Sequence, residues 1–437
     1  MSVLTEIRRA RPGDRARRRV VAPWALVSAA MFAVAWGGNE FTPLLVMYRL
    51  DHGYSPVVVD SFLFAYVFGI VPALLIGGPL SDRLGRRPVM LPAPFIAAAG
   101  SLVLATGADS SALLIGGRIL SGVGLGIGMA VGGSWLKELS ASPWDPRAGA
   151  GSGARRAAMS LTAGFALGAG AAGVLAQWAP WPSALAYLVH ISIAVVSGVA
   201  LLAAPETRPA VPADQRVPLR EDLRIPAAGH RRFRYVIAPV APWVFGSASC
   251  AYAVMPALMA PHSGGRPVAF SALLCVVALA AGFSIQALGR RIDTPRSARA
   301  VVVALAILVV GMAVGAVAAD RLTVPLALAA AAVLGGGYGM ALVSGLLEIQ
   351  RIARPDDLAG LTAVFYSLTY IGFAVPAAMA LCVQAWPTVF SYPMLFAIGA
   401  VVAVASLVLV VLRSGVDTES GDSESTPLRR SRIYPAG

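Results

Sequence analysis

The stretch that decides the fold is residues 77–91, which read "GGPLSDRLGRRPVML". It holds one aspartate and three arginines, and long apolar segments lie immediately before and after it. Such a compact charged cluster between two apolar segments is typical of a short turn at a membrane surface, where the charges stay in water. The stretch therefore predicts two consecutive membrane-spanning segments joined by a tight turn.

The composition of the whole chain agrees with a polytopic membrane protein. Of its 437 residues, 57% are hydrophobic and only 13% are charged, whereas soluble domains carry about 25% charged residues. The net charge of +13 does not indicate nucleic-acid binding, because the arginines lie in short segments between apolar runs. The three cysteines each lie inside an apolar run, so we expect no disulfide framework, no metal site and no cofactor.

Twelve apolar segments are each close to the length that a helix needs to cross a bilayer, which is about 20 residues. All twelve are predicted to be helices, because an isolated strand cannot satisfy its backbone hydrogen bonds in lipid. The predicted spans are residues 24–48, 57–79, 89–107, 112–136, 157–178, 184–204, 235–259, 268–288, 299–319, 323–347, 358–384 and 388–412.

The basic residues predict the orientation of these helices, since lysine and arginine favour cytoplasmic loops. With the N-terminus in the cytoplasm, all but four of the 35 lysines and arginines fall on the cytoplasmic side. The exceptions are Arg49, Arg266 and Arg321 in short outside loops, and Arg118 within a span. We therefore expect a multi-pass protein of the cell (inner) membrane with both termini in the cytoplasm.

Charge and proline content divide the chain into five regions. A basic cytoplasmic segment, 1–23, precedes an N-terminal bundle of six helices at 24–207. A cytoplasmic loop rich in proline and arginine, 208–234, leads to a C-terminal six-helix bundle at 235–412. The polar cytoplasmic tail, 413–437, is predicted to be disordered.

The two halves of the sequence echo each other in three places. "APWALVSAA" at 22 corresponds to "APWVFGSAS" at 241, and "GIGMA" at 126 corresponds to "GYGMA" at 337. The opening stretch also has a counterpart, because "GGPLSDRLGRRP" at 77 aligns with "AGFSIQALGRRI" at 281. These echoes predict a duplicated six-helix unit, and transporters built in this way bind their substrate between the repeats near the middle of the membrane.

The chain resembles the major facilitator superfamily of transporters at residues 77–88, which correspond to the signature between helices 2 and 3 of that family. Residues 118–124, "RILSGVG", resemble a second signature on helix 4, and "PET" at 205–207 resembles the common end of helix 6. The resemblance implies an all-α fold with twelve transmembrane helices in two pseudo-symmetric six-helix bundles. The matching positions are Gly78, Leu80, Asp82, Arg83, Gly85, Arg86, Arg87, Arg118, Gly122 and Gly124.

The residue types of the first signature suit a tight turn. Gly85 permits backbone angles that other residues avoid, and Gly78 is predicted to let a neighbouring helix approach closely. Asp82 can pair with an arginine or lie at the positive N-terminus of a helix. The resemblance implies that these residues, with Arg83, Arg86 and Arg87, form a cytoplasmic latch that holds the bundles together when the cavity faces outward. For Arg86 and Arg87 the alternative is that they only enforce the topology.

Two further similarities concern the branch of the family. Residues 164–173, "GFALGAGAAG", keep three glycines of the antiporter pattern on helix 5 but have Ala169 where that pattern has proline. Residues 36–45, "WGGNEFTPLL", resemble helix 1 of sugar-efflux members in the twelve-helix drug:proton antiporter branch. The second similarity places Asn39 and Glu40 at the cavity.

Ionisable residues inside the membrane are candidates for function, because burying them in lipid is costly. Glu40, Arg118 and His190 lie within predicted spans at similar depths. The resemblance places Glu40 and Arg118 on neighbouring cavity helices, so we hypothesise a switchable ion pair in which Glu40 carries a proton. The alternatives are a static ion pair and, for His190 on an outer helix, ordinary packing. Glu138 and Glu348, at cytoplasmic helix ends, are expected to stay solvated.

The sequence therefore predicts a transporter rather than an enzyme. We expect proton-coupled export of a small organic or amphipathic compound, such as a drug or a sugar-like molecule, by alternating access. A proton-coupled uptake symporter on the same fold is the main alternative, and a polytopic membrane enzyme is a third reading. The expected partners are the substrate, protons and the lipid bilayer, without nucleic acid, and we expect a monomer.

Overall fold

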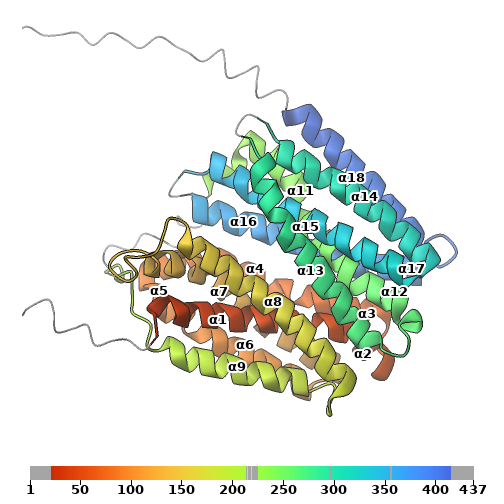
Figure 1. Ribbon diagram of the computed structural model, residues 1–437, viewed down its shortest axis with the longest axis horizontal. Coiled ribbons are helices and arrows are strands. Elements are labelled where there is room, and N and C mark those ends of the chain that lie inside the picture. Colours follow the sequence, from red (N-terminus) through yellow and green to blue (C-terminus); the bar gives the residue numbers. More distant parts are fainter. Residues whose placement is uncertain are drawn as a thin grey trace, which may run out of the picture.

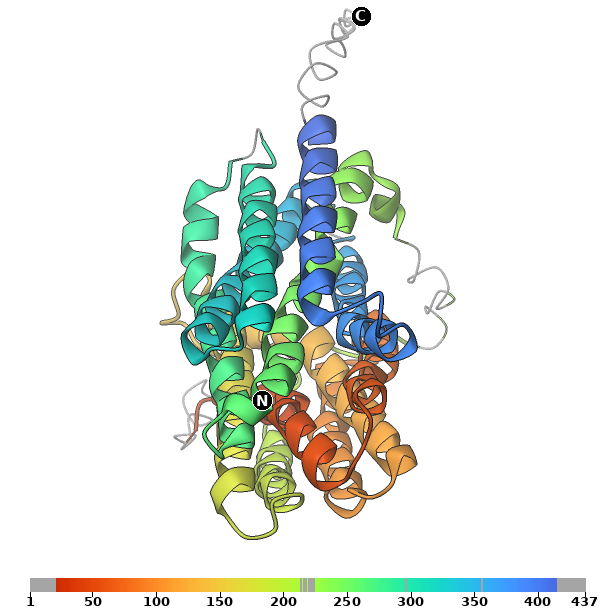
Figure 2. The same ribbon diagram turned by 90° about the vertical axis from the view of Figure 1, so that its right-hand side faces the viewer.

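The computed structural model describes residues 21–212, 214, 218, 225–294, 297–354 and 357–414. Two groups of helices lie one above the other in Figure 1, with the first half of the chain below and the second half above. Figure 2 shows the same division from the side. Most of the predicted basic segment 1–23 and of the predicted disordered tail 413–437 lies outside the described residues.

The first bundle contains the six spans predicted from the first half of the sequence. Its helices are α1 (Pro23–Asn39), η1 (Thr42–Leu44), α2 (Leu45–Asp51), α3 (Pro56–Ala65), α4 (Val67–Leu84), α5 (Arg86–Met90), α6 (Pro92–Thr106), α7 (Ser111–Leu139), α8 (Ser152–Trp178) and α9 (Leu185–Leu201).

The second bundle contains the six spans predicted from the second half. Its helices are η3 (Pro226–Gly229), η4 (Phe233–Ile237), α11 (Ala238–Ser249), η5 (Cys250–Val254), α12 (Met255–Met259), η6 (Ala260–His262), α13 (Pro267–Ile292), α14 (Arg299–Arg321), α15 (Val324–Ile352), α16 (Leu358–Ile371), α17 (Ala374–Ala385) and α18 (Tyr392–Ser414).

Ten continuous helical segments in the described ranges are long and apolar enough to cross a membrane. The two other predicted spans are helical as well. The first is interrupted by η1, so that it divides into α1 and α2, and the sixth is α9, which has 17 residues. The predicted all-α class is therefore confirmed, and each of the predicted spans corresponds to a helix or to a broken helix.

The halves repeat a close helix crossing that small residues make possible. In the first bundle α4 crosses α7, where a Cβ atom on Gly69 would lie 2.0 Å from the carbonyl oxygen of Ile119. In the second bundle α13 crosses α15, where a Cβ atom on Gly339 would lie 1.9 Å from the carbonyl oxygen of Gly282. Any side chain at either glycine would force the two helices apart.

The two bundles meet along α8 and α13, and the end of the molecule that carries residues 77–91 is called the motif end below. Away from the motif end, a Cβ atom on Gly173 would lie 2.2 Å from the Cβ atom of Ala272, so α8 and α13 are in close contact there. The side-chain oxygen of Gln177 accepts hydrogen bonds from the backbone nitrogens of Val268 and Ala269, at 3.1 and 3.2 Å. These contacts join the bundles at the end opposite the motif.

Candidate functional site

The motif turn is built around a glycine with a backbone conformation that other residues avoid. Gly85 ends α4 with φ +98° and ψ 163°, a region that is populated almost only by glycine. This turn directs the backbone nitrogens of Arg86 and Arg87 toward Glu206, whose two carboxylate oxygens accept their hydrogen bonds at 2.9 Å each. A Cβ atom on Gly85 would lie 2.7 Å from Glu206 Oε2, so the glycine also makes room for this carboxylate.

Arg86 is the centre of the charged cluster at the motif end. It is only 6% exposed. Its Nη1 donates to Asp82 at 2.6 Å and its Nη2 donates to Glu138 at 2.9 Å. Asp82 also pairs with Arg208 at 3.0 Å, and Nη2 of Arg87 donates to the carbonyl oxygen of Leu202 at 2.6 Å. These bonds tie the turn to the end of α7 and to the chain that follows α9.

The two motif glycines, Gly78 and Gly85, differ in how closely other atoms surround them. A Cβ atom on Gly78 would meet nothing within 4 Å, so the prediction that Gly78 permits a close helix approach is wrong for this conformation. The neighbouring Gly77 is closer to α7, since a Cβ atom there would lie 3.0 Å from Ala130 Cβ. For Arg83, the backbone oxygen accepts a hydrogen bond from the backbone nitrogen of Val211 at 2.9 Å.

A second charged cluster lies at the end of α15 in the second bundle. Glu348 is 1% exposed and accepts hydrogen bonds from Arg232 Nε and Arg351 Nη1, each at 2.5 Å. Arg351 also pairs with Asp293. The expectation that Glu348 stays solvated is therefore wrong, because two arginines enclose it. Glu138, whose side chain is 31% exposed, is bound by Arg86 and by the hydroxyl of Thr207.

A completely buried set of polar side chains in the first bundle joins three parts of the chain. Glu40 follows α1, Ser101 lies on α6 and His190 lies on α9, and each is 0% exposed. The hydroxyl of Ser101 lies 2.7 Å from Glu40 Oε1 and 2.7 Å from His190 Nδ1. His190 Nε2 lies 3.0 Å from the carbonyl oxygen of Ala33. This set of Glu40, Ser101 and His190 is called the buried triad below.

His190 reaches α1 because a glycine leaves room for its ring. A Cβ atom on Gly37 would lie 2.3 Å from Cε1 and 2.6 Å from Nε2 of His190. Although His190 lies on the outer helix α9, its ring therefore lies against α1 beside Glu40. Ser101 could not be predicted from the sequence, because a serine in an apolar run has no distinguishing pattern.

Arg118 and Glu40 do not form the predicted ion pair in this conformation. Among the described residues, no aspartate or glutamate lies within ion-pair distance of Arg118. Glu40 contacts His190 instead, and its Oε2 makes no hydrogen bond. The guanidinium of Arg118 instead lies between two rings, with its carbon 4.6 Å from the centre of the Phe41 ring and 4.4 Å from that of Tyr66. It donates to the carbonyl oxygens of Phe62 and Gly38, at 3.4 and 3.5 Å. Cation–π contact replaces the expected carboxylate.

Asn39 lies at the boundary between the bundles, directly before Glu40. Its amide nitrogen donates to the carbonyl oxygen of Phe165 at 3.2 Å and to Cys275 Sγ of α13 at 3.5 Å. Its side-chain oxygen accepts a hydrogen bond from Thr42 at 2.8 Å. Asn39 therefore connects the break in the first span with the second bundle.

A small chamber lies beside Asn39 between the two bundles. Its volume is about 30 Å³, which is enough for a water molecule or two but far below the roughly 300–1,000 Å³ of a typical small-molecule site. The bundles would have to separate here to admit a substrate. The chamber is lined by Gly38, Asn39, Tyr66, Phe165, Phe245, Tyr252, Leu279, Tyr338, Tyr370 and Phe373.

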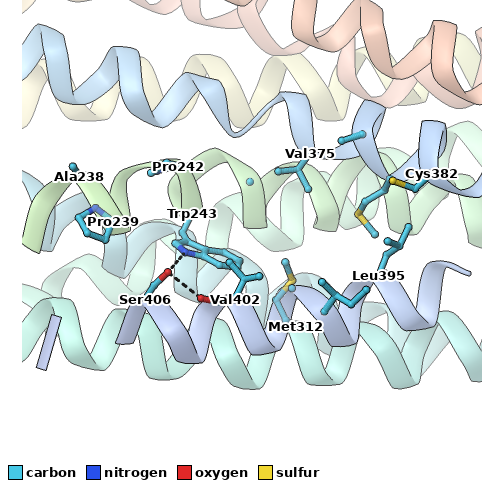
Figure 3. Close-up of a pocket in the computed structure, with 15 residues that line it drawn as sticks. Ala238, Pro239, Pro242, Trp243, Met312, Val375, Cys382, Leu395, Val402 and Ser406 are labelled. Atoms are coloured by element: carbon cyan, nitrogen blue, oxygen red, sulfur yellow. Dashed lines mark hydrogen bonds between the residues drawn. The ribbon is translucent and has the colours of Figure 1, made fainter. Parts of the chain in front are cut away.

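A larger cavity, of about 490 Å³, lies within the second bundle among α11, α14, α17 and α18. Its wall is almost entirely apolar (Figure 3), and its polar side chains Trp243 and Ser406 bond to each other at 3.2 Å. Its lining includes no carboxylate and no residue of the buried triad. The chamber between the bundles is the more polar of the two, because Asn39 and four tyrosines line it.

Comparison with known sequences identifies the family. A family model described as Major Facilitator Superfamily matches residues 25–377. The chain is 26% identical to a chloramphenicol resistance protein of Pseudomonas aeruginosa over 276 residues, which is 63% of each chain. It is 34% identical to the chloramphenicol resistance protein CraA of Acinetobacter baumannii over 28% of this chain and 29% of that one.

A third relative, an arabinose-proton symporter of Bacillus subtilis, is 33% identical over 21% of this chain and 19% of that one. The matches thus span less than two thirds of the length of these curated relatives. Among solved structures, the POT family transporter PepTSo matches with a TM-score of 0.72 and 13% identity, over 91% of this chain and 98% of that one. The nucleoside transporter NupG matches with a TM-score of 0.70 and 11% identity, over 90% and 98%.

These structural matches show the fold, and the family model covers most of the sequence. The motif turn, the repeated helix crossings and the two-bundle architecture agree with that assignment. The chain belongs to the major facilitator superfamily.

Proposed function

We propose that this transporter exports a small organic, amphipathic compound across the cell membrane in exchange for protons. Both termini and the motif end lie in the cytoplasm, and the protein acts as a monomer. The two bundles rock against each other, so that the chamber between them opens to one side of the membrane at a time. The proposal assigns transport, not catalysis, to the chain.

One observation carries the proposal of proton coupling: Glu40 is completely buried within a membrane bundle and adjoins the chamber through Asn39. A buried carboxyl group in a membrane protein is costly and is a candidate for proton transfer. Glu40 also lies between the end of α1 and the start of η1, at the break in the first span, although its backbone N–H still bonds to the carbonyl oxygen of Trp36 at 3.0 Å. A rearrangement of this break would move the carboxyl group relative to its neighbours.

Arg118 supplies the second environment that a proton carrier needs. Burial favours the neutral form of a carboxyl group, whereas a nearby arginine favours the charged form. In this conformation Glu40 contacts Ser101 and His190, and Arg118 is stacked between Phe41 and Tyr66. The proposal is that Glu40 turns toward Arg118 when it loses its proton in another conformation.

The chamber between the bundles is the proposed substrate site. Seven of its lining residues are aromatic, which suits a compound with an apolar body. The hydroxyl of Tyr66 is buried there without a hydrogen-bond partner among the described residues. It can therefore donate to a substrate. Two of the relatives are named for chloramphenicol resistance, which makes chloramphenicol a suitable probe.

The motif residues are the proposed conformational latch. In this conformation Asp82, Arg86 and Arg87 bond within the first bundle and to the chain that follows it. A latch between bundles requires that some of these bonds are exchanged for bonds to the second bundle when the chamber opens outward. Gly78 has open space beside it, so it leaves room for such an approach.

Uptake by proton symport is the second candidate, because one relative is named an arabinose-proton symporter. The direction of the pH gradient that drives accumulation distinguishes the two. Purified protein in liposomes would be supplied with labelled chloramphenicol under an imposed gradient. Antiport predicts accumulation when the lumen is acidic, since protons then leave as the compound enters, and symport predicts accumulation when the lumen is alkaline. Equal uptake with and without the gradient would contradict proton coupling.

A further inference from the structure

The hydrogen atoms of the buried triad can be counted from its geometry. His190 Nε2 lies 3.0 Å from the carbonyl oxygen of Ala33. A carbonyl oxygen can only accept, so Nε2 must carry a hydrogen to make this bond. In a neutral imidazole, Nδ1 then has no hydrogen and can only accept.

The hydroxyl of Ser101 cannot satisfy both of its neighbours when Glu40 is ionised. It has one hydrogen, and Glu40 Oε1 and His190 Nδ1 each lie 2.7 Å from its oxygen. With a carboxylate and a neutral imidazole, one of these two short contacts would join two acceptors without a hydrogen between them. One additional proton removes the conflict, because every short contact then contains a hydrogen.

Two observations place this proton on Glu40 and not on His190. First, Glu40 Oε2 is buried and makes no hydrogen bond among the described residues, which is costly for an ionised carboxylate and much less so for a neutral acid. Second, Arg118 stacks between two rings and forms no ion pair with Glu40 within the described part of the chain. An imidazolium at His190 would face Glu40 across 3.3 Å, from Nδ1 to Oε1. Oε2 would still lack a hydrogen bond in such a pair, and a buried ion pair is favourable only when its remaining polar atoms are hydrogen-bonded.

We propose that the buried triad is a proton-binding site that is loaded in this conformation. The O–H of Glu40 donates to Ser101, the O–H of Ser101 donates to Nδ1 of His190, and the Nε2–H of His190 donates to Ala33. Ser101 and His190 are thus positioning residues for the proton of Glu40. The other titratable or charged groups around the triad are Arg118 of α7, Tyr48 of α2 and Tyr187 of α9, of which the two tyrosines bond to each other at 2.8 Å.

Release of the proton reverses the direction of one hydrogen bond. When Glu40 gives its proton to water in the opened chamber, the hydroxyl of Ser101 turns and donates to Oε1 of the new carboxylate, and the unbonded Oε2 is the atom that turns toward Arg118. Nδ1 of His190 then loses its donor. That this proton is the one that drives transport rests on the proposed function, whereas the presence of the proton in the triad does not.

Infrared spectroscopy of the full chain in lipid tests the proposal without a substrate. The wild type is expected to show the C=O band of a protonated carboxyl group at neutral pH. Glu40→Gln, which keeps the shape of the side chain, should remove this band. Asp60→Asn, which neutralises another buried acid of the first bundle, should leave it in place.

The two positioning residues give the sharper readout. Ser101→Ala should shift the frequency of the band, because the acid loses its acceptor, and Ser101→Thr should restore it by returning a hydroxyl. His190→Phe should weaken the band, since Ser101 would then be free to donate to an ionised Glu40. These changes would not follow from a role in packing alone.

Two results would overturn the proposal. Absence of any band that Glu40→Gln removes would show that Glu40 is ionised in the resting protein. A band that neither Ser101→Ala nor His190→Phe alters would show that Glu40 holds its proton alone. If the spectra are as predicted but uptake into liposomes does not depend on the pH gradient, the protonated triad is supported and the proposed proton coupling is rejected. The failure of one proposal can therefore be distinguished from the failure of the other.

Discussion

Replacing Gly85 with alanine is expected to destabilise the motif turn strongly, whereas the same change at Gly78 is not. Gly85 has φ +98°, and its added Cβ atom would lie 2.7 Å from Glu206 Oε2 and 3.0 Å from the carbonyl oxygen of Arg208. An added Cβ atom on Gly78 would meet nothing within 4 Å, and this glycine lies inside the helix α4. The family signature includes both glycines, so it does not separate them.

The structure gives the approximate size of the effect. Backbone strain at a conformation reserved for glycine costs about 1–3 kcal/mol. Displacement of Glu206 would weaken its two hydrogen bonds to the start of α5, and a hydrogen bond to a charged group contributes about 1.5–3 kcal/mol. Together these predict a loss of about 4 kcal/mol for Gly85→Ala. Gly78→Ala should instead be neutral or stabilise by up to about 1 kcal/mol, because alanine favours a helix.

Thermal unfolding of the three proteins in identical lipid discs measures the difference. If the first bundle unfolds as a unit, the expected loss lowers the midpoint for Gly85→Ala by about 10 °C. The midpoint for Gly78→Ala should equal or slightly exceed that of the wild type. Similar midpoints for the two variants would refute the reasoning, because the contrast depends entirely on the positions of the neighbouring atoms.

Two other predictions concern the second bundle. Glu348→Gln should lower the free energy of unfolding by about 3–5 kcal/mol, because its two arginine partners lose a buried counter-charge. The control, Asp109→Asn at an exposed pair, should leave the thermal midpoint unchanged. Equal shifts of the midpoint in the two variants would argue against the buried cluster. Cys275 is buried and accepts a hydrogen bond across the bundle interface. In a variant with Cys250 and Cys382 replaced by serine, Cys275 should react with a maleimide faster during transport of chloramphenicol than at rest. An identical rate under both conditions would show that the interface does not open there.

The twelve spans could be predicted because each is an apolar run of the length that a bilayer requires. The interruption of the first span could not, since Asn39, Glu40 and Thr42 make this stretch more polar than its surroundings but polar residues do not by themselves end a helix. Pro43 marks a possible break, but a proline is tolerated in the first turn of a new helix. It lies in η1, which contacts α13 and η5 of the second bundle as well as α8 of the first.

The site was predicted in part. Counting residues along each helix predicts that Glu40, Arg118 and His190 lie at similar depth, and Glu40 does contact His190, but counting does not show how a helix is rotated about its axis. Arg118 therefore has aromatic neighbours instead of Glu40, and Glu40 has Ser101 and His190. The space that brings His190 to α1 depends on a glycine, Gly37, among several in that segment.

At the motif end too, the type of residue required could be predicted from the sequence, but the contacts could not. The need for a glycine at the turn followed from the sequence, because a tight reversal demands unusual backbone angles. The partners of the motif did not, since Glu138 and Glu206 lie on segments far away in the chain. The position of Glu348 near a helix end predicts that it lies in water, but Arg351 in the last turn of α15 and Arg232 before α11 both bind it.

The central claim is that Glu40 carries the proton that drives transport, and transport by Glu40→Gln in liposomes tests it most directly. The variant keeps the shape of the side chain and resembles the loaded state of the triad, but it cannot release a proton. We predict that it still exchanges labelled for unlabelled chloramphenicol at equal pH and no longer accumulates the compound when the lumen is acidic. Full accumulation driven by the pH gradient in this variant would contradict the account.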